Sequence, residues 1–425
     1  MLQSKLFTKI IKEAPKDETS FNAQYLIRAG FINKEIAGVY SYLPLGLRVI
    51  KKIENIIRQE MNTVGGIEMK TSIMQNKEVW KKSNRWDDDV VDNWFKTKLK
   101  NGMEVGLSFT NEEAYSNILK QYVNSYKDLP FYPYDFKEIF RNEVRSKSGI
   151  IRGREFYWKA LYSFSKDKEE HDVFYDKMKI AYKNIFNRAG IGDSTYLTYS
   201  SGGTFSKFSH EFQTICDAGE DIIYISKDDY GKGLGMDRNH AAVNKEIWTD
   251  DLKKDLGLKG DFEEKKAVEV GNIFTLGTKF AEPFNLKYKN EKGKDKMVFM
   301  GSYGIGLGRL MGTIVEIHND KNGVIWPKEV APFQVHLISL GAGNEIKDAS
   351  DKIYNDLQDN NIEVLYDDRA NKSVGEKFNE ADLIGIPIRL VVSKKTLAED
   401  SIEVKKRDED KEELVKLTEL LKYVK

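Results

Sequence analysis

The chain of 425 residues is expected to form an α+β domain with an antiparallel sheet, followed by a small α/β domain. Up to residue 330, strand-like stretches of alternating apolar residues are separated by long helical stretches, without a regular strand–helix repeat. Beyond residue 330, strands and helices alternate. We therefore expect two domains, residues 1–330 and residues 331–425, the second of a usual domain size.

The first domain contains recognisable helices and strands. Between Leu47 and Met61, apolar residues recur every three or four positions, which predicts a helix. Residues 136–145 and 150–164 alternate between apolar and polar side chains, and the turn RSKSG separates them, so they predict an antiparallel hairpin. A helix is expected at 168–189 because NRAGIG follows as a stop signal. Further strands are expected at 209–215, 267–277 and 296–306, the last followed by a helix.

The second domain follows a linker, residues 324–333, that contains two prolines. Its pattern predicts a strand, a helix, a strand, a helix and two strands, at 334–340, 344–359, 362–368, 373–385, 386–394 and 401–407. The spacing of four leucines predicts a closing helix that contains Leu414, Leu417, Leu420 and Leu421.

The composition is that of a soluble globular protein, with 40% hydrophobic and 32% charged residues. Basic and acidic residues both number 67, so a polyanionic partner must be met by local basic patches. Cys216 is the one cysteine, which excludes a disulfide framework and fits a reducing cytoplasm. No apolar run approaches the roughly 20 residues of a membrane span. The N-terminal stretch lacks the apolar core of a signal peptide, so we expect a cytoplasmic protein without a membrane partner.

The densest cluster of charge is FRNEVRSKSGIIRGREF, residues 140–156. One interpretation is a solvated basic ribbon that contacts nucleic-acid phosphates without specificity. The other is a pocket, in which Arg141 and Glu143 share a strand face and Arg152 returns on the neighbouring strand. An arginine fork binds carboxylate or phosphate, and the face of Phe156 can stack on a nucleobase. These details favour a pocket that holds ATP together with an anionic co-substrate.

Three segments resemble the signature motifs of the class II aminoacyl-tRNA synthetases: residues 37–62 (motif 1), residues 140–156 (motif 2) and GSYGIGLGRL, residues 301–310 (motif 3). Other stretches, among them SFTNEE, SHEFQ and YDDRANKSVGEKFNEADLIGIPIRLVV, are most similar to the bacterial prolyl-tRNA synthetases. The resemblance implies the class II synthetase fold for residues 1–330 and an anticodon-binding domain for residues 331–425. It does not extend over about 217–266, a short insertion where bacterial members usually carry a large editing domain.

The resemblance also implies an activity. ATP-dependent activation of L-proline to prolyl-adenylate is expected, then transfer of proline to tRNA(Pro), with Mg²⁺ as the metal and a homodimer formed through motif 1. The alternative is a non-catalytic synthetase-like protein that binds RNA or regulates, although the presence of Arg141 and Arg309 counts against it. A related threonine enzyme would be expected to hold zinc with Cys and His ligands, which a single cysteine disfavours.

Site residues follow from the matched motifs. The catalytic residues are expected to be Arg141 and Arg309. The implied ATP-binding residues are Arg141, Glu143, Arg152, Phe156, Gln213 and Arg309. The implied proline-binding residues are Thr110, Glu112, Arg141, Trp158 and His210, and the implied metal ligand is Glu211.

Two of these assignments have structural alternatives. The triplet Asn111-Glu112-Glu113 also has the pattern of a helix N-terminus with acidic residues in its first turn, and both interpretations remain open. Trp158, on a strand, could equally be a core residue. The sequence departs from the family pattern at Ala160, Asn272 and Ser302.

Overall fold

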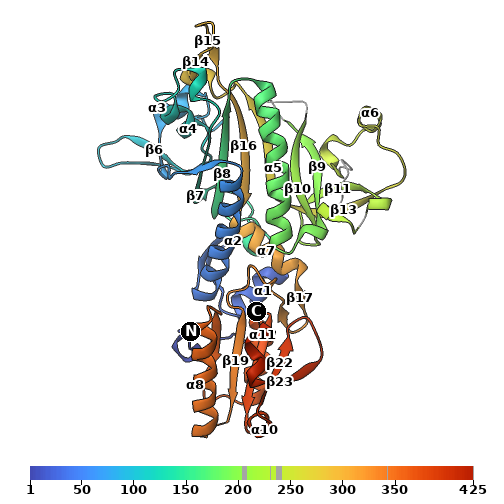
Figure 1. Cartoon of the computed structure of the whole chain (residues 1–425). Coiled ribbons are helices and arrows are strands. Elements are labelled where there is room, and N and C mark those ends of the chain that lie inside the picture. Colours follow the sequence, from blue (N-terminus) through green and yellow to red (C-terminus); the bar gives the residue numbers. More distant parts are fainter. Residues whose placement is uncertain (203–207, 230, 236–241, 342, 425) are drawn as a thin grey trace. The chain divides into compact units, whose positions relative to one another are not determined.

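The computed structural model describes residues 1–202, 208–229, 231–235, 242–341 and 343–424. Two compact units form from the chain (Figure 1). One consists of Ile36–Val39 and Glu54–Thr313, and the other of Met1–Glu35, Tyr40–Ile53 and Ile314–Lys425. No helix within the described segments is long and apolar enough to cross a bilayer.

The unit of residues 54–313 is built on one large, mainly antiparallel sheet. In the part of the chain that the structure describes, nine strands follow the order β10-β9-β12-β11-β13-β16-β8-β7-β3. Neighbours run antiparallel except for the pairs β3–β7 and β9–β12. The strands are β3 (Gly66–Glu68), β7 (Tyr132–Phe140), β8 (Glu155–Ser165), β9 (Thr195–Ser201), β10 (Phe208–Ile215), β11 (Asp221–Ser226), β12 (Ala242–Asn244), β13 (Phe262–Gly277) and β16 (Phe299–Gly306). This sheet confirms the predicted α+β class.

Helix α5 (Lys168–Arg188) covers one face of this sheet (Figure 1). Its N-cap residue Asp167 accepts a hydrogen bond from the backbone N–H of Glu170, and Arg188 occupies the last turn, as the helix dipole favours. Aromatic residues on its buried side, among them Phe174, Tyr182 and Phe186, pack on the strands. The candidate active site lies on the opposite face of the sheet.

The predicted hairpin is correct in outline but its strands are shorter. β7 ends at Phe140 and β8 begins at Glu155, so most of the basic segment is a loop that includes a 3-10 turn at Gly149–Ile151. Arg141 N still donates to Arg154 O at 2.8 Å, after which the chain leaves the ladder. Ser148 and Gly149 then take φ values of 56° and 60°, in the left-handed region. The prediction that the charged residues alternate along two strand faces was therefore wrong.

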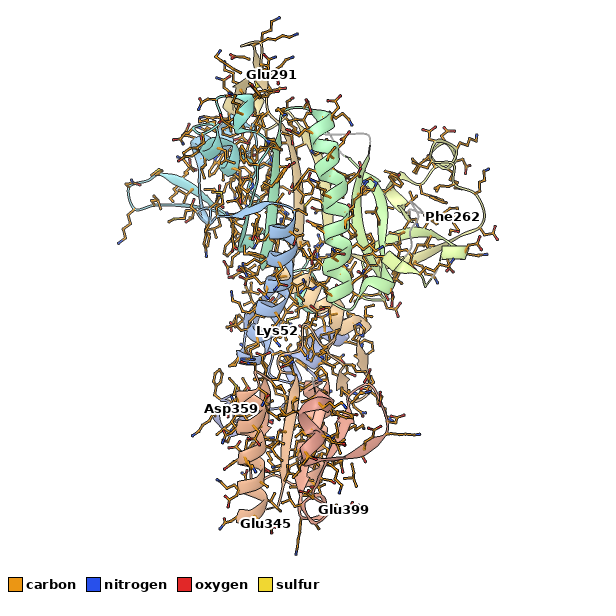
Figure 2. All side chains as sticks on the ribbon, in the orientation of Figure 1. Lys52, Phe262, Glu291, Glu345, Asp359 and Glu399 are labelled. Carbon is orange, nitrogen blue, oxygen red and sulfur yellow. The ribbon has the colours of Figure 1, made fainter. Side chains whose placement is uncertain are left out.

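Smaller elements complete this unit. In the segments described here, a three-stranded sheet has the strand order β4 (Met74–Asn76), β6 (Glu104–Leu107), β5 (Lys96–Lys98). Trp80, Trp86 and Trp94 pack into one cluster beside it. The remaining elements are α3 (Lys77–Lys82), α4 (Glu112–Leu119), α6 (Asp250–Asp255) and the pair β14 (Lys287–Lys289) and β15 (Asp295–Met297). Figure 2 labels Glu291 in the turn between β14 and β15.

Two helices contribute residues to both units. α2 (Pro44–Thr63) confirms the helix predicted around Leu47–Met61. Its buried face includes Ile50, Ile53, Ile57 and Met61, whereas Leu47 is 47% exposed. α7 (Leu307–Ile317) follows β16 directly.

The other unit contains a five-stranded sheet, in the order β20-β19-β21-β22-β23 over the residues that are described. Its strands are β19 (Val335–Leu340), β20 (Val364–Asp367), β21 (Ile388–Ser393), β22 (Ser401–Lys406) and β23 (Glu412–Lys416). Its helices are α8 (Asn344–Asp359), α9 (Val374–Ile384), α10 (Lys394–Ala398) and α11 (Leu420–Val424), and Figure 2 labels Glu345 and Asp359 at the two ends of α8. The closing helix is shorter than predicted, because Leu414 lies in β23.

The N-terminal residues belong to this same unit. Met1 N donates to Val364 O at 2.7 Å, and Gln3 Oε1 lies 2.8 Å from His336 Nε2. Helix α1 (Phe21–Arg28), the hairpin β1 (Ile32–Ile36) and β2 (Val39–Tyr42), and the short pair β17 (Asn319–Asp320) and β18 (Gly323–Val324) complete the described elements. The domain boundary expected near residue 330 stays a prediction.

Candidate active site

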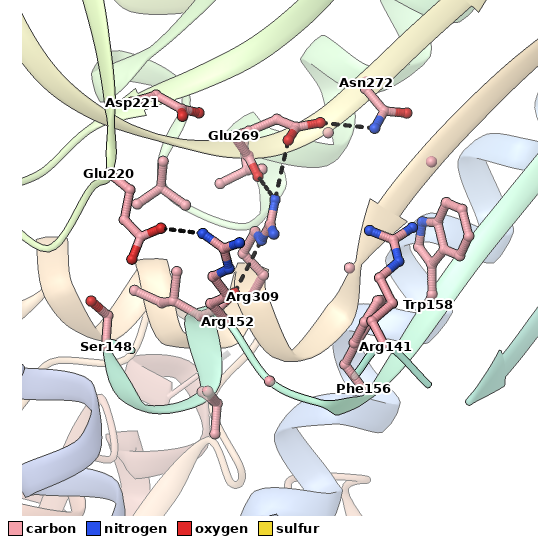
Figure 3. Close-up of a pocket in the computed structure, with 18 of the residues that line it drawn as sticks. Arg141, Ser148, Arg152, Phe156, Trp158, Glu220, Asp221, Glu269, Asn272 and Arg309 are labelled. Carbon is pink, nitrogen blue, oxygen red and sulfur yellow. Dashed lines mark hydrogen bonds and ion pairs between the residues drawn. The ribbon is translucent and has the colours of Figure 1, made fainter. Parts of the chain in front are cut away.

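A cavity of about 300 Å³ opens on the face of the large sheet away from α5 (Figure 3). This volume is at the lower end of the range for small-molecule sites. The loop after β7, strand β8, strand β13 and the β16–α7 junction surround it. Its charged and aromatic lining residues are Arg141, Glu143, Arg152, Phe156, Trp158, Glu220, Asp221, Glu269 and Arg309.

Arg141 brings a buried positive charge to the cavity wall. Its guanidinium lies 5.1, 5.4 and 5.7 Å from the ring centroids of Phe109, Phe156 and Trp158. Its Nε atom is buried and has no hydrogen-bond partner among the described residues. Burial, and then the nearby charge of Arg309, lower the pKa of Arg141. A guanidinium held between aromatic rings with an unused donor suits an anionic ligand.

Arg152 is held at the mouth of the cavity by two carboxylates. Its Nη2 donates to Glu143 Oε2 at 2.7 Å. Its Nη1 donates to Glu220 Oε2 at 2.5 Å (Figure 3). The hydrogen bond to Glu143, with further contributions from Glu220, raises the pKa of Arg152. Its side chain is 43% exposed, so the fork can be reached from solvent.

Arg309 lies in the first turn of α7, which places it at the cavity edge. Its Nη1 donates to the carbonyl oxygen of Glu269 at 2.8 Å and approaches Glu269 Oε2 at 3.3 Å. Its Nε donates to Ile151 O at 3.1 Å, which ties α7 to the loop between β7 and β8. The second carboxylate oxygen of Glu269, Oε1, accepts a hydrogen bond from Asn272 Nδ2 at 2.8 Å (Figure 3).

Gly304 on β16 lies next to Trp158 and Asn272, two residues that line the cavity. A Cβ atom there would lie 2.7 Å from the indole ring of Trp158 and 3.0 Å from Asn272 Oδ1. Both approaches are closer than ordinary van der Waals contact. Glycine at position 304 therefore leaves the space that the Trp158 indole occupies.

Buried carboxylates lie on the strands next to the cavity. Gln213 Nε2 donates to Glu211 Oε2 and to Asp221 Oδ2, both at 2.9 Å. Burial, and then the charge of Glu269, raise the pKa of Glu211 to about 7. Burial likewise raises the pKa of Asp221. The Oε1 atom of Gln213 is buried without a partner in the described segments, so a further polar ligand would be accommodated.

The residues next to the cavity offer carboxylates to a metal ion. Within the residues described, no group of three or more His, Cys, Asp or Glu side chains could hold a metal by itself. Mg²⁺ is usually held by one or two carboxylates together with phosphate oxygens. One or two of the carboxylates Glu211, Asp221 and Glu269 would meet that requirement, because a divalent cation would relieve the repulsion between them.

Thr110 and Glu112 form a buried cluster further along β8. Thr110 Oγ1 donates to Glu112 Oε2 at 2.5 Å, and Tyr162 OH donates to Glu112 Oε1 at 3.2 Å. Tyr162 and Trp158 are four residues apart on one strand, so they share its face. Glu112 and Glu113 are also the acidic first turn of α4. Neither Thr110 nor Glu112 is among the residues that line the cavity.

His210 lies on the opposite side of the sheet from its neighbour Glu211. Its Nδ1 atom is 2.9 Å from Tyr175 OH on α5, and burial lowers its pKa to about 3. The structure thus brings together six of the predicted residues, Arg141, Glu143, Arg152, Phe156, Trp158 and Arg309. The other predicted residues, Thr110, Glu112, His210, Glu211 and Gln213, do not line the cavity, and His210 faces α5. Sequence reasoning did not identify Glu220, Asp221 or Glu269, which also line the cavity. Glu269 could have been found from the predicted strand 267–277, where it stands between two apolar residues.

Comparison with known proteins gives the class first. Residues 95–318 match the family described as "tRNA synthetase class II core domain (G, H, P, S and T)", and residues 334–425 match "Anticodon binding domain". The fold is thus that of a class II aminoacyl-tRNA synthetase.

Full-length relatives identify the family within that class. The proline–tRNA ligase of Agrobacterium fabrum is 37% identical over 432 aligned residues, with 98% of each chain covered. That of Hyphomonas neptunium is 36% identical, with 100% of each chain covered. The chain belongs to the proline–tRNA ligase family.

Solved structures agree with the fold. Giardia lamblia prolyl-tRNA synthetase, in complex with prolyl-adenylate, superposes with a TM-score of 0.77 at 20% identity, covering 94% of this chain and 75% of that one. Cryptosporidium parvum prolyl-tRNA synthetase, complexed with L-proline and AMP, gives a TM-score of 0.76 at 18% identity, covering 97% and 77%.

Proposed function

We propose that the chain activates L-proline with ATP to form prolyl-adenylate and then transfers proline to tRNA(Pro). The observation that carries this proposal is the Arg141 guanidinium, held among aromatic rings with an unused buried Nε. Family membership supports the proposal, because the full-length relatives are named proline–tRNA ligases. The Giardia lamblia relative has prolyl-adenylate bound.

The reaction needs positioning and charge neutralisation more than a side-chain nucleophile. A carboxylate oxygen of proline attacks the α-phosphorus of ATP, a P–O bond forms, and the bond to the β-phosphate oxygen breaks to release pyrophosphate. Arg141 would bind the prolyl carboxylate and the α-phosphate, where negative charge builds up. Arg152 and Arg309 would bind the outer phosphates and leave their carboxylate partners.

The remaining residues would bind and orient the substrates. Phe156 would stack on adenine, with Glu143 next to it, while Gln213 would offer its unpaired Oε1 to the ribose. Glu112 and Thr110 would accept the hydrogen bonds of the prolyl ammonium, and Trp158 would wall the ring. Mg²⁺, held through Glu211 or its neighbours Asp221 and Glu269, would supply charge neutralisation of the triphosphate. We leave His210 out of this set because it faces α5.

The partners follow from the proposed activity. tRNA(Pro) is the proposed nucleic-acid partner, with residues 334–425 at its anticodon. A homodimer through residues 37–62 and a cytoplasmic location are also proposed. No observation favours the non-catalytic alternative, since both arginines line the cavity.

ATP–pyrophosphate exchange, run with each amino acid separately, tests the activity. We expect exchange with proline, a weaker signal with alanine, and none with threonine or serine. Removing a charged donor aimed at the developing charge costs on the order of 100- to 1000-fold in kcat, so Arg141→Ala should lose nearly all exchange.

The matched control is Arg145→Ala, which removes an exposed arginine of the same loop. It should keep the exchange rate, which requires no tRNA. Folded wild-type protein that shows no exchange with any amino acid would overturn the proposal in favour of a binding protein.

A further inference from the structure

The first turn of α4 carries two adjacent carboxylates that are both withdrawn from solvent. Glu112 is 8% exposed and Glu113 is fully buried. Burying a carboxylate without a partner is strongly unfavourable, and burying two next to each other is more so. Burial, offset in part by Arg85, raises the pKa of Glu113 to about 7. The pair therefore depends on a nearby cation.

That cation is Arg85, which follows α3 in the sequence. Its Nη1 atom lies 3.0 Å from Glu113 Oε1 and 3.5 Å from Glu112 Oε2. Its guanidinium also lies 5.1 Å from the ring centroid of Trp80 and 5.4 Å from that of Phe280. Because these rings flank it, Arg85 is fixed in place and shielded from water, which strengthens its interaction with the carboxylates.

Neutral donors complete the surroundings of each carboxylate. Thr110 and Tyr162 donate to separate oxygens of Glu112. Ser83 donates to Glu113 Oε1 at 2.7 Å, while Glu113 Oε2 is buried without a partner in the described chain. Thr110 and Tyr162 orient Glu112 but do not balance its charge. Arg85 therefore brings one positive charge against the two acids and contacts both of them.

We propose that Arg85 is a positioning residue for proline recognition: it keeps the Glu112 carboxylate charged and aimed, so that Glu112 can accept hydrogen bonds from the prolyl ammonium. The proposal rests on the proposed function, in which Glu112 contacts proline. Arg85 does not line the cavity that would hold ATP, so its effect should be confined to the amino acid.

The charged and titratable groups that face the pair define the pH behaviour. On α4 itself these are the two acids, and from other elements they are Arg85, Tyr162 on β8 and, further away, Arg141 and Lys279. Arg85 holds down the pKa of Glu113, so loss of the Arg85 charge favours proton uptake there. A proton bound at Glu113 reduces the negative charge that attracts the prolyl ammonium, so the acid limb of kcat/KM for proline should move to higher pH.

Proline-dependent exchange by the full chain, measured from pH 5.5 to 9, tests this with Arg85→Gln and Arg85→Lys. We expect KM for proline to rise about ten- to hundredfold in Arg85→Gln, as loss of charge-assisted hydrogen bonds implies. KM for ATP should stay within about twofold, and the acid limb should shift upward. Arg85→Lys keeps the positive charge but loses the two-pronged guanidinium. Its KM for proline should therefore lie between those of the wild type and Arg85→Gln.

Arg188→Gln is the matched control, because Arg188 pairs with Glu60 at 3.1 Å and has a similarly covered side chain. It should keep both KM values. If Arg85→Gln does not fold, Arg85→Gln combined with Glu113→Gln removes one charge of each sign and relieves the buried acid. That double variant should still show the raised KM for proline.

The outcomes separate the two proposals. Suppose that the wild type shows exchange and that either Arg85→Gln or the double variant keeps the wild-type KM for proline. That result would overturn the role of Arg85 and leave the proposed function standing. Equal losses for proline and ATP would do the same, since they indicate a structural role. Wild-type protein without proline-dependent exchange would overturn the proposed function, and the role of Arg85 with it.

Discussion

Replacing Gly304 with alanine would place a methyl group where the wall of the cavity is already filled. The new Cβ would meet the Trp158 ring at 2.7 Å, its Nε1 atom at 2.8 Å, and Asn272 Oδ1 at 3.0 Å. Carbon atoms in contact prefer about 3.5–4.0 Å, so the indole must move by roughly 1 Å. Trp158 cannot move without disturbing the Arg141 guanidinium, 5.7 Å from its ring centroid.

The cost follows from the packing. Forcing a methyl group into a filled site usually costs about 1–3 kcal/mol, and because Trp158 lines the cavity, part of this should fall on substrate binding. A loss of that size corresponds to roughly 5- to 150-fold in kcat/KM. We expect Gly304→Ala to lower kcat/KM for proline in the exchange assay by this range, with the thermal midpoint reduced by a few degrees.

Gly375→Ala provides the control, since a Cβ at Gly375 in α9 meets no atom within 4 Å. It should leave exchange unchanged and, as alanine favours helix, hold or raise stability by up to about 1 kcal/mol. A Gly304→Ala enzyme with wild-type kcat/KM and an unchanged thermal midpoint would refute the packing argument.

Three further expectations follow from the structure. Glu220→Gln should lower KM for ATP by about two- to fivefold, because it removes a carboxylate that competes with phosphate for Arg152; a higher KM would mean that Glu220 orients Arg152 instead. Burial lowers the pKa of His336 to about 4, so its contribution to the unfolding free energy should be lost as pH drops below about 6.5, while the raised pKa values of Glu113 and Glu211 act in the opposite direction. Urea titrations of the wild type and of His336→Gln between pH 8 and 5 isolate the histidine: the wild type should lose more unfolding free energy than the variant, and equal losses would contradict this. Alanine should be mischarged at some rate, because one to two methylenes discriminate weakly, and the purified chain should not deacylate Ala-tRNA(Pro); rapid release of alanine would contradict that.

The sequence allowed the large elements and the site class to be predicted because both depend on local patterns. α5, α8 and the strands of the second unit lie close to their expected ranges, since their apolar spacing is long and regular. The matched motifs pointed to Arg141, Phe156 and Arg309, which line one cavity.

The rest required three-dimensional information. Alternation of polar and apolar residues continued past Phe140, but periodicity does not show where hydrogen bonding between strands stops. His210 and Glu211 are adjacent in sequence, and only the position of α5 determines which of them faces the cavity. Glu220 and Arg152 are 68 positions apart, so their ion pair left no local pattern to detect.

The position of Glu220 affects how this enzyme could be given a new module by engineering. The segment 217–266 is the natural place for a graft, but cutting at its ends would remove Glu220 and Asp221 from the cavity. Strand β11 also pairs with the beginning of β13, with Asp221 opposite Ala267 and Ser226 opposite Phe262. Strand β12 lies between β11 and β9 in the sheet, so a graft must also leave Ala242–Asn244 in place. The stretch open to replacement is therefore 249–260, between β12 and β13, which contains α6 and no strand of the large sheet.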